Sequence, residues 1–202
     1  MNLFDLHCDT ASELYAQKKS LAENDLHIDL ARLCAFPCCA QIFAVWTPPE
    51  LSGKERTDHA LRVIDYFRNE LEKNSRFIAL CTSAKELDQT LAAGKVAALL
   101  GIEGGGALDG SLENLHRLHS LGVRVLTLTW NGKNELGAGN PDPDGLSPFG
   151  EKALAEMEAL GVIADLSHAN PATFRGALEH SSQPLIASPS NASEVFDHPR
   201  NL

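Results

Sequence analysis

The chain has 202 residues, a net charge of −10, and 44% hydrophobic against 22% charged residues. This balance is typical of a soluble globular protein rather than a disordered one. An acidic chain is a poor candidate for binding nucleic acid or an anionic membrane, since both need clustered Lys and Arg. No apolar run approaches the roughly 20 residues of a membrane span, and no signal peptide is evident at the start.

Strand-like apolar runs alternate with helical patterns along the chain. Strands are predicted at 2–6, 39–46, 76–81, 96–103, 123–130, 162–166 and 184–188. Helices are predicted at 54–73, 82–94, 112–121 and 150–160, and from 170 onward. Most strands are apolar on both faces, which is typical of parallel β/α units. No Gly/Ser linker divides residues 1–202, so we expect a single partial barrel domain with about seven strands, one fewer than a (β/α)8 barrel.

The five cysteines bear on the cellular compartment. Their odd number, with two of them adjacent, makes a poor disulfide framework. Cys34, Cys38 and Cys39 lack the second ligand pair of a zinc finger, so free thiols are the expected state. We therefore expect a reducing, cytoplasmic location.

Metal-ligand side chains follow the C-terminal ends of several predicted strands. His7 and Asp9 follow the first strand, and period-two alternation puts both on one side, where they could chelate one ion. Glu103 ends the fourth strand, and His168 follows the sixth. Because chemistry collects at this edge of a parallel β/α fold, the four residues together indicate a metal site.

Each of these side chains also has a purely structural interpretation. A His-x-Asp pair is often part of a turn, Glu103 could cap the Gly-rich turn that follows it, and His168 could be a core histidine. Glu103 nevertheless ends a continuous apolar run, and a buried carboxylate needs a cation or several donors. The chain has no Gly-x-Ser-x-Gly elbow and no cysteine in an electropositive context, which argues against a Ser or Cys nucleophile.

Five segments, in order, resemble motifs of the membrane dipeptidase (renal dipeptidase) family of zinc peptidases. They are Asp5-Leu-His7-Cys-Asp9, Gly101-Ile-Glu103-Gly-Gly, Leu126-Thr-Leu-Thr-Trp130-Asn131, Asp165-Leu-Ser-His168 and Pro184-Leu-Ile-Ala-Ser188. The resemblance runs from residue 1 to residue 202. It implies a TIM-like (β/α)8 metal-dependent hydrolase barrel with two zinc ions that hydrolyses dipeptides, often with a D-residue at the C-terminal position.

The resemblance also implies roles for the metal-ligand residues. His7 and Asp9 would hold the first zinc, and His168 the second. Glu103 would bridge both ions and position a metal-bound hydroxide that attacks the scissile carbonyl.

Three further residues are implied to bind substrate. Arg200 matches the family arginine that binds the substrate carboxylate, for which a planar guanidinium is well suited. Trp130 and Asn131 would lie beside the substrate. Trp130 replaces a histidine of the mammalian enzymes, a variation that resembles bacterial members. Family members are commonly dimers, so the resemblance also allows a homodimer.

Two departures from the family pattern concern the second metal and the end of the barrel. Pro189 stands where the family has a metal-ligand histidine, and its side chain offers no ligand atom. The chain stops at Leu202, before the eighth strand and its catalytic aspartate. We expect a zinc-dependent dipeptidase that is impaired by both changes.

Two alternatives stay open. One is a non-catalytic remnant that binds one metal or a dipeptide. The other is a different amide or ester hydrolase on the same metal barrel, with the long loop 131–149 setting the substrate.

Overall fold

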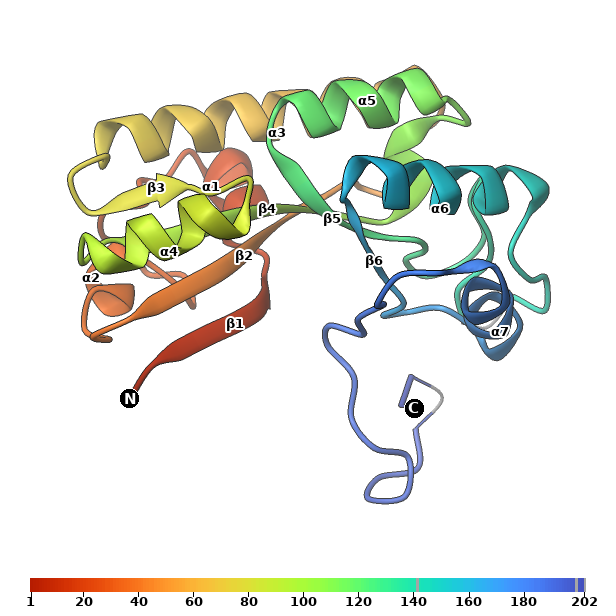
Figure 1. The fold of residues 1–202 in the computed structure, drawn as a ribbon. Coiled ribbons are helices and arrows are strands. Elements are labelled where there is room, and N and C mark those ends of the chain that lie inside the picture. Colours follow the sequence, from red (N-terminus) through yellow and green to blue (C-terminus); the bar gives the residue numbers. More distant parts are fainter. Residues whose placement is uncertain (141, 199, 202) are drawn as a thin grey trace.

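The computed structural model describes residues 1–140, 142–198 and 200–201, and a curved, wholly parallel sheet forms its centre (Figure 1). Among these residues six strands pair in the order β1-β2-β4-β5-β6, with β3 joined to β4. Their bounds are β1 Leu3–Cys8, β2 Cys39–Trp46, β3 Ile78–Leu80, β4 Val96–Glu103, β5 Val123–Thr127 and β6 Ile163–Asp165. The prediction of an α/β fold with an incomplete parallel barrel is confirmed.

Helices connect successive strands, and α3, α5 and α6 lie along one side of the sheet (Figure 1). A short 3₁₀ helix, η1, follows β4. The helix bounds are α1 Thr10–Gln17, α2 Leu30–Leu33, α3 Lys54–Lys73, α4 Ala84–Ala92, η1 Gly105–Leu108, α5 Leu112–Ser120, α6 Pro148–Leu160 and α7 Pro171–His180. Within the described ranges, no helix combines the length and the apolarity that crossing a membrane requires.

Two predicted strands end differently in the structure, and two helices were not predicted. The strand predicted at 184–188 is reduced to one parallel bridge between Asp165 and Ile186. Pro184 has no N–H to donate to a ladder, and β6 itself is only 3 residues long. The fifth strand ends at Thr127, three residues before the predicted end, although Leu128 still donates its N–H to the Asp165 carbonyl at 3.0 Å and accepts from Gly105 N at 3.2 Å. Helices α1 and α2 were not predicted.

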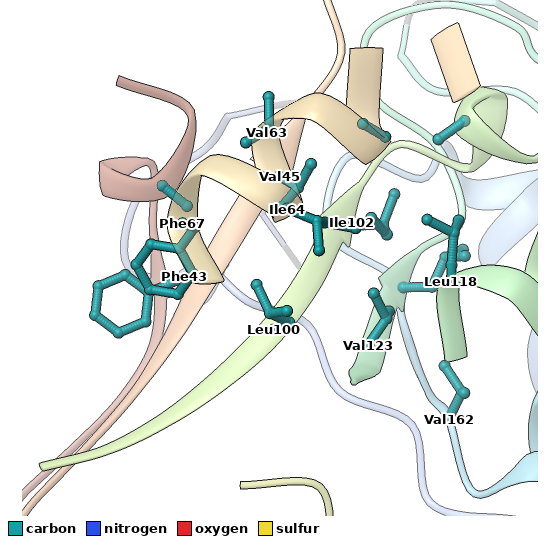
Figure 2. Close-up of a cluster of buried hydrophobic side chains, with 14 of the residues drawn as sticks. Phe43, Val45, Val63, Ile64, Phe67, Leu100, Ile102, Leu118, Val123 and Val162 are labelled. Atoms are coloured by element: carbon teal, nitrogen blue, oxygen red, sulfur yellow. The ribbon is translucent and has the colours of Figure 1, made fainter. Parts of the chain in front are cut away.

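The hydrophobic core lies between the sheet and α3. Phe43 of β2 packs against Phe67 of α3 with ring centroids 4.6 Å apart (Figure 2). Ile64 of α3 and Leu100 and Ile102 of β4 are buried in the same cluster. Burying each such side chain contributes about 1.5–3 kcal/mol, so α3 is fixed on β2 and β4, whose ends carry the site described below.

Strand register aligns four side chains across the C-terminal edge of the sheet. Trp46 pairs with Glu103, Glu103 with Thr127, and Thr127 with Asp165. We call these four residues the C-terminal row. Neighbouring strands are about 4.8 Å apart, so residues on the flanking strands lie close to Glu103 at the centre.

Asp165 ties three segments together at one end of this row. Its carboxylate accepts hydrogen bonds from Thr127 Oγ1 (2.9 Å), Ser167 N (3.0 Å) and Ser188 N (2.9 Å), and Ser188 Oγ lies 3.1 Å away. Ser188 Oγ is also 3.4 Å from the carbonyl of Leu6 in β1. The buried carboxylate therefore joins β5, the turn after β6 and the segment that approaches β1.

Glu158 of α6 holds the beginning of that same segment. Its carboxylate accepts from the hydroxyls of Ser181 and Ser182 (both 2.6 Å) and from the backbone N–H groups of Ser182 (2.8 Å) and Gln183 (3.1 Å). These hydrogen bonds, of which the one from the Ser181 side chain has the largest effect, lower the pKa of Glu158 to about 2.

Replacing Phe67 by Ala should lower the free energy of unfolding by about 3–5 kcal/mol, because the cavity opens in the centre of the core. Urea denaturation measures this loss. Phe77→Ala, at a side chain that is 49% exposed, is the control and should cost less than about 1 kcal/mol. Equal losses would contradict the assignment of this core.

Asp165→Ala should cost at least about 2 kcal/mol, since the amides of Ser167 and Ser188 would be left buried without an acceptor. Asp165→Asn is the matched variant. Its carbonyl can accept from both amides while its NH₂ donates to the Thr127 and Ser188 hydroxyls, so the loss should stay within about 1 kcal/mol. A loss for Asn as large as that for Ala would show that charge, rather than hydrogen bonding, is what this position needs.

Glu158→Gln should make stability less sensitive to acid. The pKa of Glu158 is lower in the folded protein, so its contribution is complete above the ordinary value of 4.5 and is lost as pH falls towards 2. Melting temperatures at pH 5 and pH 2.5 should therefore differ more for the wild type than for Glu158→Gln. The same difference in both proteins would contradict the anchoring role.

Candidate metal centre and adjoining cleft

Three ligand side chains converge where β1 and β4 end. His7 lies near the end of β1, Asp9 just precedes α1, and Glu103 is the last residue of β4. His7 Nε2 is 3.3 Å from Asp9 Oδ1 and 3.7 Å from Glu103 Oε2. One ligand atom from each residue lies within 4.8 Å of the others. We call this group the His7 cluster.

The local backbone explains why these side chains meet. The register between β1 and β2 shifts between Asp5 and Cys8, and such irregularities re-aim side chains at the end of a strand. The Asp5 carboxylate accepts from the backbone N–H of His7 at 3.3 Å. Glu103 occupies the centre of the C-terminal row and is 7% exposed.

The donor set of the His7 cluster fits a divalent metal ion. Four ligands at about 2.1 Å around a tetrahedral zinc lie about 3.4 Å from one another. The separations of 3.3 and 3.7 Å are close to that value. Imidazole nitrogens and carboxylate oxygens are both ligands that zinc takes in proteins.

The pKa shifts of His7 and Asp9 reflect their contact with each other and, for His7, the charge of Glu103. Burial lowers the pKa of His7, but the hydrogen bond with Asp9 and the charge of Glu103 outweigh it, so the net pKa is raised. The hydrogen bond with His7 is the main reason why the pKa of Asp9 is lowered, against the opposing effect of burial. The raised pKa of His7 is what indicates a site that favours a positive charge.

His168 approaches Glu103 from the other side. Its Nε2 lies 3.3 Å from Glu103 Oε1, and its Nδ1 lies 3.2 Å from Asn131 Oδ1. The residue is 8% exposed and has a left-handed backbone with φ of 67°, which is uncommon outside glycine and clusters at functional sites. Glu103 therefore separates two imidazoles, with Oε2 towards His7 and Oε1 towards His168.

Arg200 and Pro189 complete the surroundings of His168. Arg200 Nη2 is 3.0 Å from His168 Nε2 and 3.4 Å from Ser167 Oγ. Ser167 Oγ in turn donates to the Pro189 carbonyl at 3.0 Å. Pro189 thus lies near His168 but contributes only a backbone oxygen, which is already hydrogen-bonded.

A cleft of about 220 Å³ opens beside Glu103 and is lined by Trp130 and Asn131. Trp130 packs edge-on against Trp46 with centroids 5.3 Å apart and lies 6.1 Å from the ring of His168. We call this hollow the tryptophan cleft. A larger, open hollow of about 770 Å³ is lined by His7 and Asp9, by residues of α1 and by the segment before α2.

All of the residues expected at the site lie around Glu103. They are His7, Asp9, Glu103, His168, Trp130, Asn131 and Arg200. The sequence interpretation missed Trp46, although it ends the second strand at the same edge and the strand-end argument applies to it equally. The contact between Arg200 and His168 had no sequence signal, because it depends on how a loop without regular structure folds back.

Comparison with known proteins identifies the family. A family model described as membrane dipeptidase, peptidase family M19, matches residues 1–202. Dipeptidase 3 of Mus musculus is 35% identical over an alignment of 171 residues that covers 81% of this chain and 34% of that protein. The chain thus spans about a third of the length of this relative.

Solved structures agree over the whole chain. A metallopeptidase from Rhodobacter sphaeroides, liganded with a phosphinate mimic of the dipeptide L-Ala-D-Ala, matches with a TM-score of 0.91 and 25% identity. A protein described as dipeptidase AC, also a metallopeptidase, matches with a TM-score of 0.90 and 28% identity. Both matches cover all of this chain. They cover 68% of the Rhodobacter protein and 67% of dipeptidase AC. The chain therefore belongs to the membrane dipeptidase family of metallopeptidases, peptidase family M19.

Proposed function

We propose that this protein is a metal-dependent dipeptidase in which the His7 cluster holds zinc and the tryptophan cleft receives the substrate. The observation that carries the proposal is the convergence of His7, Asp9 and Glu103 within 4.8 Å beside that cleft. Membership in a metallopeptidase family supports the reaction class. Zinc itself is inferred from the donor set.

The size and lining of the tryptophan cleft support a small peptide substrate. Its volume of about 220 Å³ is below the range of about 300–1,000 Å³ for sites that take drug-sized ligands. Trp130 offers a flat apolar wall, and Asn131 offers amide hydrogen-bonding groups. The dipeptide mimic bound to the Rhodobacter protein is consistent with this substrate class.

The residues of this chain would divide the work of hydrolysis. Zinc, when bound, supplies a Lewis acid that polarises the scissile carbonyl and lowers the pKa of water. His7 and Asp9 would fix the ion at the end of β1. Glu103, held between two imidazoles, would orient the attacking water. Trp130 and Trp46 would exclude bulk solvent from one side, which strengthens electrostatic interactions inside.

A non-catalytic protein that binds one metal or a dipeptide is the second candidate. The observation that favours it is Pro189, which provides no side-chain ligand near His168. A different amide or ester hydrolase would use the same centre with another substrate. The cytoplasmic location and the homodimer stay predictions from the sequence.

Glu103→Gln should lower kcat for a dipeptide such as Ala-Ala by at least about 100-fold, because it removes one charge from the centre of the site. Chelator-treated protein should be inactive and should regain activity with zinc. Glu156→Gln is the control, since this residue pairs with His116 at 3.0 Å on the helical side and should leave kcat unchanged. Turnover is followed by release of free amino acids.

The readouts separate the candidates. Bound zinc without turnover of any dipeptide, in a protein that unfolds cooperatively, would exclude the dipeptidase and favour the binding protein. Turnover of an ester or another amide, but of no dipeptide, would favour the third candidate.

A further inference from the structure

The two sides of Glu103 are chemically different. Oε2 faces His7 and Asp9, which together with Glu103 make a compact ligand set. Oε1 faces His168, and the third group on that side is the guanidinium of Arg200 rather than a ligand. The two sides therefore do not offer equivalent metal positions.

The geometry points to a one-metal centre in which the guanidinium of Arg200 takes the position of a second metal ion beside His168. This inference rests on the proposed function for the first ion, at the His7 cluster. It assigns Arg200 as a positioning residue with a permanent positive charge.

A second ion would need more ligands than this side provides. Protein zinc sites use at least three protein ligands. Glu103 Oε1 and His168 Nε2 supply two, and the side chain of Pro189 supplies none. The hydroxyl of Ser167 is engaged with the Pro189 carbonyl and with Arg200.

The hydrogen bonds of His168 use the lone pair that a metal would need. A guanidinium only donates, so the contact of 3.0 Å makes Nε2 of His168 the acceptor. The ring proton is then on Nδ1, where it can be donated to Asn131 Oδ1 at 3.2 Å. Both ring nitrogens thus have a hydrogen-bond partner without a metal ion, and the 3.3 Å contact between Nε2 and Glu103 Oε1 is not a hydrogen bond in this tautomer.

Arg200 is suited to this position electrostatically. A guanidinium stays charged at all ordinary pH values, so it can offset the Glu103 carboxylate without a bound ion. Ser167 connects it to the Pro189 carbonyl, so the residue that lacks a ligand atom instead helps to hold the arginine. Arg200 Nε is buried and has no partner among the described residues, so the Nη2 contacts are what orient the group.

Zinc binding to matched variants tests the inference. Equilibrium dialysis followed by elemental analysis should find one zinc per wild-type chain. His7→Asn should weaken zinc binding by more than about 100-fold, which is beyond the loss expected for a group that only supports a ligand. In His168→Asn the zinc affinity should stay within about tenfold of that of the wild type. Asparagine tolerates the left-handed backbone at 168, and cooperative unfolding of both variants is the check on folding. Two tightly bound ions in the wild type would overturn the inference.

A second measurement does not depend on zinc or on activity. ¹⁵N NMR of the metal-free protein should show His168 as the Nδ1–H tautomer, and Arg200→Ala should shift the Nε2 signal of His168 while leaving that of His7 in place. An unchanged His168 signal would overturn the inference. Failure of the wild type to bind any zinc would instead contradict the proposed function. If one zinc is bound but no dipeptide is turned over, the proposed function fails while the assignment of Arg200 to the second metal position still holds.

Discussion

The in-register pairing of β2, β4, β5 and β6 is the constraint on which the site depends. It aligns Trp46, Glu103, Thr127 and Asp165 in one row. Of the two buried carboxylates in this row, Glu103 contacts the candidate metal ligands, and Asp165 holds neighbouring segments of the chain together. A one-residue slip of any of these strands would turn its own side chain in the row to the opposite face of the sheet. The core beneath the sheet fixes that register, which links hydrophobic packing directly to the positions of charged groups.

The two carboxylates of the row are neutralised in different ways. Asp165 is satisfied by neutral donors, so it can be buried at 1% exposure without a cation. Glu103 faces two imidazoles and has no comparable set of backbone donors among the described residues. A buried charge without such donors needs a cation nearby. Asp165 therefore serves to hold segments of the fold together, whereas Glu103 is the carboxylate suited to bind a cation at the candidate site.

Strand-end reasoning from the sequence predicted that His7, Asp9, Glu103 and His168 lie together, because their positions follow from parallel β/α topology, and the structure places these four candidate residues side by side. It could not find the fold of the C-terminal segment. The apolar run at 184–188 looks like a strand, yet only Ile186 pairs with β6. Contacts between distant segments decide such cases, and no local pattern encodes them.

The site also joins the two ends of the sheet. β1 and β6 are the outermost strands of the pairing order, yet their C-terminal ends meet at Glu103 through His7 on one side and His168 on the other. The sheet must curl for this to happen, and the Ser188 hydroxyl, 3.4 Å from the Leu6 carbonyl, marks where the ends approach. An ion at the His7 cluster would tie β1 to β4, whereas Arg200 ties the β6 side through His168. The curvature of the sheet and the burial of Glu103 are therefore linked. Opening the sheet would separate the Glu103 carboxylate from the positive charges at the His7 cluster and at Arg200 that allow its burial.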